Sequence, residues 1–285
     1  MGYFYVVLAA VLFGAAPTFQ RQALLTGVTP AGLMVMTNGV TVLGAAVFAL
    51  PRRRDLRVSG RQLLHLALMG VSMGLTGLLL NYAYNYLAVG FVTMIHFLYP
   101  SVVCIAMALF FREKLTPLKA GAAAVSVGGL ALLSGGGSAG SFTGVLLAAL
   151  SSLTYGFYVI SNEKGSANTL PTVVKVMYSM FFSLMMNLCV ALGTKAVFPF
   201  SGPALLPSLL AGVMIGSATF LLCVGIRHLG ASTSAFINML EPVTSLLVSA
   251  LVYRYAVSAR SGLGCALVLS SVLMTALGSR KIARR

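Results

Sequence analysis

Long apolar stretches joined by short polar connections constrain this chain more than any other feature. A helix needs about 20 mostly apolar residues to cross the hydrocarbon core of a bilayer. We count ten such stretches, at residues 3–20, 31–50, 63–86, 90–111, 117–134, 142–161, 171–192, 204–226, 231–253 and 259–278. Because a helix also satisfies its own backbone amides and carbonyls in lipid, we expect an all-α polytopic membrane protein with ten transmembrane helices.

Charged residues are scarce, and the positive ones lie between the apolar stretches. Only 8% of the 285 residues are charged, whereas a soluble domain has about 25%. A net charge of +15 would suggest nucleic-acid binding in a soluble protein. In membrane proteins, however, Lys and Arg chiefly set the orientation of the loops. We therefore expect a lipid bilayer around the chain and no nucleic acid as a partner.

The distribution of these positive residues predicts the orientation. With ten spans, both termini lie on the same side of the membrane. Fifteen of the 19 Lys and Arg residues fall on that side: Arg52, Arg53, Arg54, Arg57, Arg61, Arg112, Lys114, Lys119, Lys164, Lys175, Arg227, Arg280, Lys281, Arg284 and Arg285. The other four are Arg21, Lys195, Arg254 and Arg260. Because Lys and Arg accumulate in cytoplasmic loops, we predict an inner-membrane protein with both termini and a basic tail in the cytoplasm.

The sequence also repeats itself with a shift of 142 residues. The shift places Ser59-Gly60 on Ser201-Gly202, Gly70-Val71 on Gly212-Val213, Gly74 on Gly216, Ile95 on Ile237 and Pro100 on Pro242. Each half then holds five helices, and an odd number inverts the second half in the membrane, as in many secondary transporters. We predict one integrated transport domain: a first repeat at 1–134, a Gly/Ser hinge at 135–141 and a second repeat at 142–285.

Both repeats contain a pair of glycines four residues apart. These are Gly70 and Gly74 in the first repeat, and Gly212 and Gly216 in the second. Small residues at this spacing let helix backbones approach closely, and in lipid such packing drives helix association. We interpret them as packing positions.

Glu241 is the one acidic residue that does not lie near the end of an apolar stretch. An ionisable side chain at that depth costs about 2.5–3.5 kcal/mol on insertion scales, and it marks a candidate functional site by default. Pro242 follows it, and a proline removes a backbone donor and clashes with the preceding turn. Pro242 and its repeat counterpart Pro100 are therefore candidate hinges.

The repeat register pairs Tyr99 with Glu241 and His96 with Asn238. Residues three apart share a helix face, so each helix presents one of these pairs just before its proline. If the pseudo-two-fold axis passes between the two helices, the four side chains converge near the bilayer midplane, where repeat-built transporters bind substrate. The alternative is a satisfied polar network that locks the two helices together.

Other polar residues within apolar stretches are weaker candidates for substrate binding. Asn81 and Asn85 are four residues apart, which suits one wall of a cavity. The remaining candidates are Asn38, Tyr82, Tyr155 and Tyr178. Hydrogen bonding between helices explains each of these about as well.

The sequence offers no arrangement typical of an enzyme. It has no Ser–His–Asp set and no pair of carboxylates in one apparent site, and the three histidines are too scattered to bind a metal. Its four cysteines lie unpaired in apolar stretches and are typical of small core residues. We expect neither a cofactor nor a metal.

The order of several short motifs resembles the EamA-type members of the drug/metabolite transporter superfamily. The motifs are Leu12-Phe13-Gly14 with Pro17, residues 108–116 followed by Gly121, Leu98-Tyr99-Pro100 and Leu240-Glu241-Pro242. The second half has Arg254-Tyr255-Ala256 where the first has Arg112-Glu113-Lys114, so it lacks the acid of this motif. The resemblance implies a central cavity lined by spans 1–4 and 6–9, peripheral spans 5 and 10, and alternating access. It also implies amino acids, related metabolites or drugs as substrates, commonly exported.

Together these features predict a secondary active transporter that exports a small polar or amphipathic metabolite. No nucleotide-binding motif is present, so a gradient of an ion or of substrate would drive it. Glu241 would carry a coupling proton or pair with a cationic group of the substrate. The alternatives are a passive channel or facilitator and, less favoured because only four acids are present, a membrane-embedded enzyme.

Overall fold

The computed structural model describes residues 1–49, 56–83, 85–87, 89–113, 117–133, 141–199, 202–254 and 258–283. Over these ranges the chain forms helices joined by short turns, and it has no strand. The helices of the first half are α1 (Gly2–Leu24), α2 (Pro30–Ala49), α3 (Gly60–Ala83), α4 (Val89–His96), α5 (Tyr99–Phe111) and α6 (Pro117–Leu133). Those of the second half are α7 (Phe142–Glu163), η1 (Ser166–Thr169), α8 (Thr172–Gly193), η2 (Gly202–Ala204), α9 (Leu205–Leu229), α10 (Ala231–Ile237), α11 (Leu240–Tyr253) and α12 (Ala259–Ala283).

Each apolar stretch predicted to span the membrane contains helix, and two of the stretches contain a broken helix. The broken ones are α4–α5 and α10–α11. Among the described residues, seven helical segments are long and apolar enough to cross a membrane by length and composition. Three further apolar helices are shorter, at Tyr99–Phe111, Ala120–Leu132 and Ala259–Met274. The all-helical class is thus confirmed, while the count of ten spans stays a prediction.

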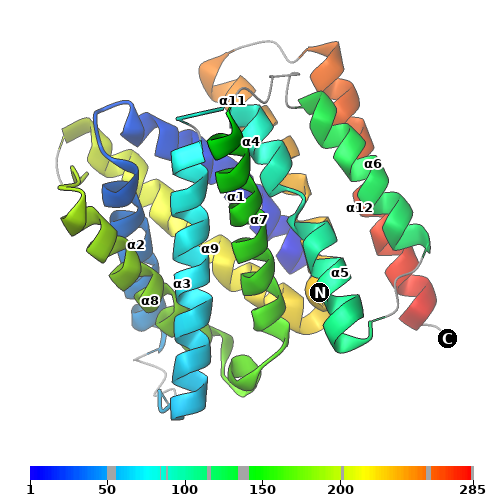
Figure 1. The fold of residues 1–285 in the computed structure, drawn as a ribbon, viewed down its shortest axis with the longest axis horizontal. Coiled ribbons are helices and arrows are strands. Elements are labelled where there is room, and N and C mark those ends of the chain that lie inside the picture. Colours follow the sequence, from blue (N-terminus) through cyan, green and yellow to red (C-terminus); the bar gives the residue numbers. More distant parts are fainter. Residues whose placement is uncertain are drawn as a thin grey trace.

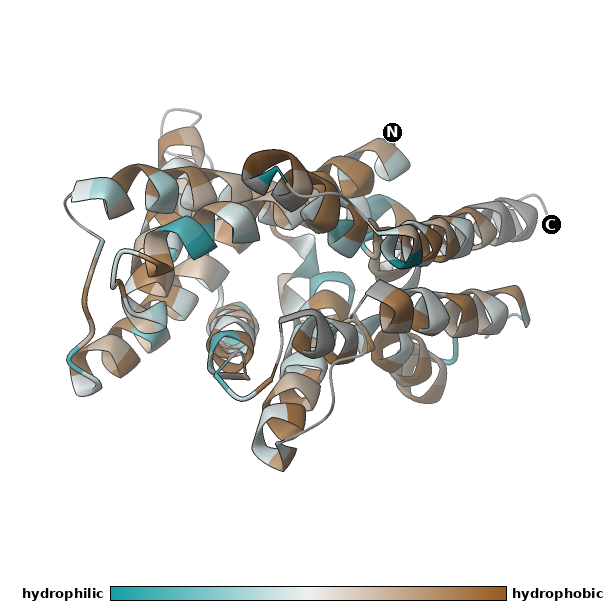
Figure 2. Ribbon diagram, turned by 90° about the horizontal axis from the view of Figure 1, so that it is seen from above, coloured by the Kyte–Doolittle hydropathy of each residue, from teal (hydrophilic) through white to brown (hydrophobic). Residues whose placement is uncertain are grey.

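The outward surfaces of these helices are apolar, as expected for a protein surrounded by lipid. Figure 2 shows hydrophobic colour over much of the ribbon and hydrophilic colour in short stretches. Large apolar side chains are exposed on many helices, including Leu43 on α2, Leu64 on α3, Leu109 on α5 and Leu251 on α11. Soluble monomers rarely expose so much apolar surface.

Exchanging the two halves of the chain exchanges the main contacts between helices. The packing of α1 on α9 corresponds to that of α7 on α3, and the packing of α3 on α8 corresponds to that of α9 on α2. The pairs α2–α8 and α6–α12 each contain one helix and its own counterpart. The α6–α12 pair lies at one edge of the bundle, at the right of Figure 1. The two halves are therefore related by a pseudo-two-fold axis.

The same symmetry holds for individual residues, with the shift of 142 found in the sequence. A methyl group placed on Gly70 would lie 2.7 Å from Cβ of Phe182, and one on Gly212 would lie 2.8 Å from Cβ of Val40. Other equivalent pairs are Gly74–Ser183 with Gly216–Thr41, Gly14–Thr244 with Gly156–Val102, and Gly2–His228 with Gly144–Tyr86. The predicted glycines thus lie at close helix contacts, as their spacing indicates.

Counterpart helices run antiparallel, which an inverted repeat requires. On α6, Ser126 precedes Gly129. On α12, Val268, the partner of Gly129, precedes Ser271, the partner of Ser126. The Ser126 hydroxyl donates to Ser271 Oγ at 2.6 Å, and a methyl group on Gly129 would lie 2.9 Å from the Val268 side chain.

The two broken helices are also equivalent. The first break lies between His96 and Tyr99 and precedes Pro100, and the second lies between Ile237 and Leu240 and precedes Pro242. Proline has no amide to donate and is tolerated in the first turn of a helix, so each new helix begins where its proline fits. Each of the two candidate hinge prolines therefore follows a helix break, while motion about it stays a prediction. Residues 135–140 of the predicted hinge lie outside the described residues.

We predict that Gly70→Ala lowers the stability of the folded protein. The added methyl group would lie 2.1 Å from the backbone oxygen of Ser179, and overpacking of this kind costs about 1–3 kcal/mol. The matched control is Gly44→Ala on α2, because a methyl group there meets nothing within 4 Å. Apparent melting temperatures of the purified proteins in detergent test this. Equal melting temperatures for the two variants would contradict the proposed contact.

Candidate functional site

Asn238 connects the two broken helices. It lies in the break between α10 and α11, is 0% exposed, and donates from Nδ2 to Tyr99 Oη at 3.2 Å and to Glu241 Oε2 at 3.2 Å. Tyr99 is the first residue of α5, and its side chain is likewise 0% exposed. Glu241, one turn after Asn238, is partly exposed. The two helix breaks therefore meet through side chains.

The break in the second half exposes a backbone acceptor that Tyr99 then uses. In an unbroken helix the carbonyl of Ala235 would accept from the amide of Met239. That amide donates to Phe236 O instead, at 3.2 Å. The Tyr99 hydroxyl donates to Ala235 O at 3.3 Å. A side chain of one broken helix thus satisfies a carbonyl released by the other.

Aromatic rings pack beside this junction. The ring of Tyr99 lies 4.6 Å from that of Tyr155 on α7, edge to face, and 5.7 Å from that of His96. His96 Nδ1 lies 3.0 Å from Ser151 Oγ. We call Asn238, Glu241, His96, Tyr99 and Tyr155 the break cluster. It places one carboxyl group on the α10–α11 side and aromatic rings on the α4–α5 and α7 side.

A second polar group continues from this cluster along α7. The rings of Tyr155 and Tyr158 are stacked with their centroids 6.1 Å apart. The Tyr158 hydroxyl lies 3.6 Å from Cys223 Sγ, and that thiol donates to Asn162 Oδ1 at 3.0 Å. The sequence pattern placed Cys223 among small core residues, and only contacts between α7 and α9 reveal its polar partners.

Lys175 is buried, although its place in the sequence put it among the basic residues of the cytoplasmic side. It lies in the first turn of α8, is 3% exposed, and donates from Nζ to the carbonyl of Asn162 at 3.0 Å. That carbonyl belongs to the last turn of α7, where carbonyls have no partner within the helix. A cation near a helix C-terminus is also favoured by the helix dipole. Lys175 is therefore explained as a cap of α7.

Three of the other candidates make bonds that do not involve the break cluster. Asn38 Nδ2 donates to Ser183 Oγ at 2.9 Å between α2 and α8. The Tyr178 hydroxyl donates to Leu56 O at 3.1 Å, and Asn81 Nδ2 donates to Gly77 O of its own helix at 2.8 Å. Of these three bonds, only that of Asn38 joins two helices, since Leu56 precedes α3 and Gly77 lies on the same helix as Asn81.

The predicted face shared by Asn81 and Asn85 is wrong, because the helix ends earlier than the apolar stretch. α3 ends at Ala83. In the following turn the amides of Asn85 and Tyr86 donate to carbonyls three residues earlier, at 3.1 Å and 3.0 Å. Asn85 is exposed there, and Tyr82 is exposed near the helix end.

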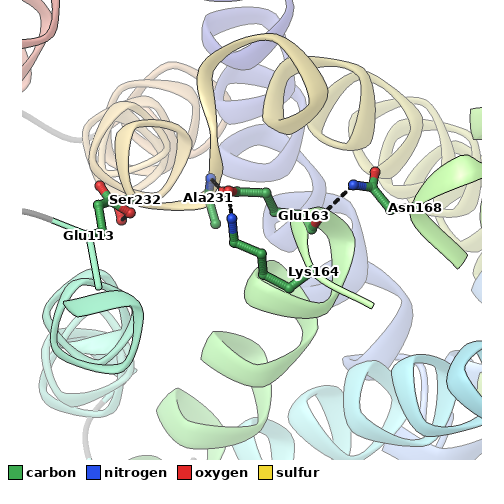
Figure 3. A network of polar contacts seen from close by, with 6 residues as sticks. All are labelled: Glu113, Glu163, Lys164, Asn168, Ala231 and Ser232. Carbon is green, nitrogen blue, oxygen red and sulfur yellow. Dashed lines mark hydrogen bonds and ion pairs between the residues drawn. The ribbon is translucent and has the colours of Figure 1, made fainter. Parts of the chain in front are cut away.

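Two carboxylates hold the start of α10 at one end of the bundle (Figure 3). Glu163, the last residue of α7, accepts the backbone amide of Ala231 through Oε2, and its Oε1 pairs with Lys164 Nζ at 2.6 Å. Glu113, just after α5, accepts from Ser232 Oγ at 2.8 Å. We call these bonds the α10 latch.

The positions related to the α10 latch by the repeat hold no acidic residue. The residues shifted by 142 from Glu163, Glu113 and Ser232 are Arg21, Tyr255 and Gly90.

Beside the latch lies a cavity of about 330 Å³, lined by Met107, Phe111, Glu113, Glu163, Lys164, Leu229, Gly230, Ser232 and Thr233. Within the described ranges, no three His, Cys, Asp or Glu side chains are grouped so that they could hold a metal.

Comparison with known proteins gives the following matches. The model of the EamA-like transporter family matches residues 1–135 and 142–277. A solved structure described only as "Crystal structure of protein" superposes with a TM-score of 0.85 at 18% identity, and the match covers 99% of this chain and 98% of that one. At that identity the likeness concerns the fold alone. No curated protein matches the sequence.

We predict that Glu163→Ala loosens the start of α10. Without the carboxylate the amide of Ala231 loses its acceptor, and a hydrogen bond to a charged group contributes about 1.5–3 kcal/mol. Hydrogen exchange at Ala231, measured by mass spectrometry, should accelerate by about tenfold or more. Lys164→Ala is the control, because it leaves the acceptor of the Ala231 amide in place and removes a partly exposed ion pair, which contributes about 0–1 kcal/mol, together with the contact of Lys164 Nζ with the Phe111 ring. Unchanged exchange in Glu163→Ala would contradict the α10 latch.

Proposed function

Since the chain belongs to the EamA-like transporter family, we propose that it is a secondary active transporter that exports a small metabolite. Membership identifies it as an integral membrane protein of a transporter family whose substrates are small molecules. The proposed substrate is an amino acid or a related polar or amphipathic compound, and transport follows alternating access. The proposed transport cycle includes no enzymatic step.

The observation that carries the proposal is the meeting of two repeat-related helix breaks around one carboxyl group. Repeat-built transporters bind substrate where discontinuous helices meet near the midplane. The contact of Asn238 with Tyr99 and Glu241 supports such a site here. An ionisable residue in an apolar span is energetically costly, so its presence beside a helix break indicates a functional site by default.

The proposed arrangement in the membrane has ten spans and both termini in the cytoplasm of an inner membrane. Residues 1–134 and 142–285 are the two repeats, and 135–141 link them within one transport domain. Pro100 and Pro242 act as hinges, because the backbone bonds are already interrupted beside them. The α10 latch holds the cytoplasmic end of α10, and its release opens that end.

Glu241 has one of two roles in this proposal. It carries a coupling proton, or it pairs with a cationic group of the substrate. Asn238, His96, Tyr99 and Tyr155 complete the binding site. Asn38, Asn81, Asn85, Tyr82 and Tyr178 stay candidates for contact with substrate along the transport path.

Counterflow distinguishes this carrier from a passive channel. Proteoliposomes loaded with an unlabelled amino acid should transiently accumulate the same labelled amino acid above its outside concentration. A channel gives only equilibration, because it does not couple the two fluxes through one alternating site. Equilibration without overshoot for every transported compound would favour the passive channel.

Glu241→Gln tests the proposed role of the carboxyl group. We expect counterflow to fall by about tenfold or more, because loss of an interaction of about 1.4 kcal/mol changes a rate or affinity tenfold. Glu241→Asp is the control that keeps the charge and should keep measurable transport. Full transport by Glu241→Gln with an unchanged pH profile would exclude both roles.

A further inference from the structure

The connection between α7 and α8 is held on the first turns of α3 by a bond that depends on protonation. The amide of Ala167, a buried residue of η1, donates to Nδ1 of His65 at 3.1 Å. In a neutral imidazole only the nitrogen without a proton accepts, so the proton of His65 lies on Nε2. When both ring nitrogens are protonated, the ring has no acceptor. The bond therefore exists only while His65 is neutral.

Further bonds between α3 and this connection do not depend on pH, and they lie on the exposed side. Gln62 Nε2 donates to Ser166 O at 3.4 Å, and the Ser166 hydroxyl donates to Arg61 O at 3.1 Å. The His65 ring lies closer to the connection, because a methyl group placed on Gly165 would be 2.8 Å from its Nε2. The imidazole is thus both the packed contact and the titratable one.

The charges around His65 oppose a second positive charge. The titratable side chains on the elements packed against this end of α3 are Glu163 and Lys164 at the end of α7 and Lys175 and Tyr178 on α8, while α2 and η1 have none. Arg57 and Arg61 precede His65 along its own segment. Glu163 and Lys164 pair with each other, and Lys175 is the group whose charge acts on His65. A proton on His65 therefore adds repulsion from Lys175 to the loss of a bond, and both effects favour separation of α3 from η1 and α8.

η1 is bonded in turn to the residue that holds α10 (Figure 3). Asn168 Nδ2 donates to the backbone carbonyl of Glu163 at 2.7 Å. The side chain of Glu163 accepts the amide of Ala231 in the α10 latch. Lys175 Nζ donates to the carbonyl of Asn162 at 3.0 Å, so α8 holds the same turn of α7. Displacement of η1 and α8 from α3 therefore acts on the last turn of α7 and, through it, on the start of α10.

We propose that His65 makes the cytoplasmic end sensitive to pH. Its neutral ring holds η1 on α3 and keeps the α10 latch closed, and its protonation loosens both. Histidine changes charge between about pH 5 and about pH 8, and His65 is partly exposed, so a proton reaches it from the water at that end. The inference rests on the proposed function only for the cytoplasmic orientation and for the opening that follows release of the latch.

Hydrogen exchange measured by mass spectrometry between about pH 8 and about pH 5 tests this inference. The purified protein in detergent is used, and each rate is divided by that of the same peptide in the denatured protein at the same pH. In the wild type, exchange at Ala167 and at Ala231 should accelerate at the acidic end by about three- to tenfold, the effect of one hydrogen bond.

Two substitutions of His65 separate its proton from its packing. His65→Asn keeps an acceptor oxygen near the position of Nδ1, and an amide takes up no proton in this range, so both rates should stay constant with pH. His65→Leu removes the acceptor and should show the faster rates at both ends of the range. The matched control is His228→Gln, because His228 lies just before α10 and its ring stacks on that of Tyr5. It should keep the wild-type response.

Four results would overturn the inference. Equal acceleration in the wild type and in His65→Asn would assign the response to another group, such as the Glu163 carboxylate. Constant rates in the wild type, or loss of the response in His228→Gln, would exclude His65 as the sensor. Acceleration at Ala167 without any at Ala231 would show that η1 does not act on the α10 latch.

The proposed function fails separately. Absence of counterflow at every pH, with the exchange response of the wild type and its loss in His65→Asn intact, would contradict transport and leave the pH-sensitive contact standing. The two failures are therefore distinguishable.

Discussion

The need to satisfy every backbone polar group in a lipid surrounding governs this structure. Helices meet that need along most of the described chain, and the two helix breaks are the places where they do not. At the second break the Ala235 carbonyl loses the amide that would bond it in a regular helix and accepts the Tyr99 hydroxyl. The break is therefore sustained by a residue of the other repeat. The second broken helix thus depends on a residue of the first, which places the break cluster at the contact between the halves.

Close packing of small residues provides the symmetric frame for that contact. The glycines at equivalent positions meet equivalent partners, as in Gly70 against Phe182 and Gly212 against Val40. Packing of this kind replaces the hydrophobic effect as the main attraction between helices in lipid. The frame is thus nearly symmetric, while the polar groups mounted on it are not. Glu241 occupies the position that corresponds to Tyr99, and the positions that correspond to the two acids of the α10 latch hold Arg21 and Tyr255.

The sequence predicted the frame better than the chemistry. Hydropathy located helix in each predicted stretch, and the shift of 142 predicted which residues are equivalent. Both predictions need only the residue types and their order along the chain. The register paired His96 with Asn238 and Tyr99 with Glu241, whereas the side-chain bond between the two breaks runs from Asn238 to Tyr99. In contrast, the end of α3 at Ala83 was missed because the apolar composition continues beyond it. The burial of Lys175 and the bond from Ala231 to Glu163 were missed because they depend on contacts between distant segments.

The contrast between a symmetric frame and asymmetric polar groups bears on how such a molecule can work. Under the proposed alternating access, a frame with two equivalent halves would have two arrangements of similar packing energy, since a packing interaction that opens in one half has an equivalent that can form in the other. Identical polar groups in both halves would leave the two arrangements equally populated. The single acid at the break cluster and the α10 latch at one end remove that balance. In the proposed transport cycle, this asymmetry would let a ligand or a proton at Glu241 favour one arrangement over the other, because only a difference in binding between two states can shift their populations.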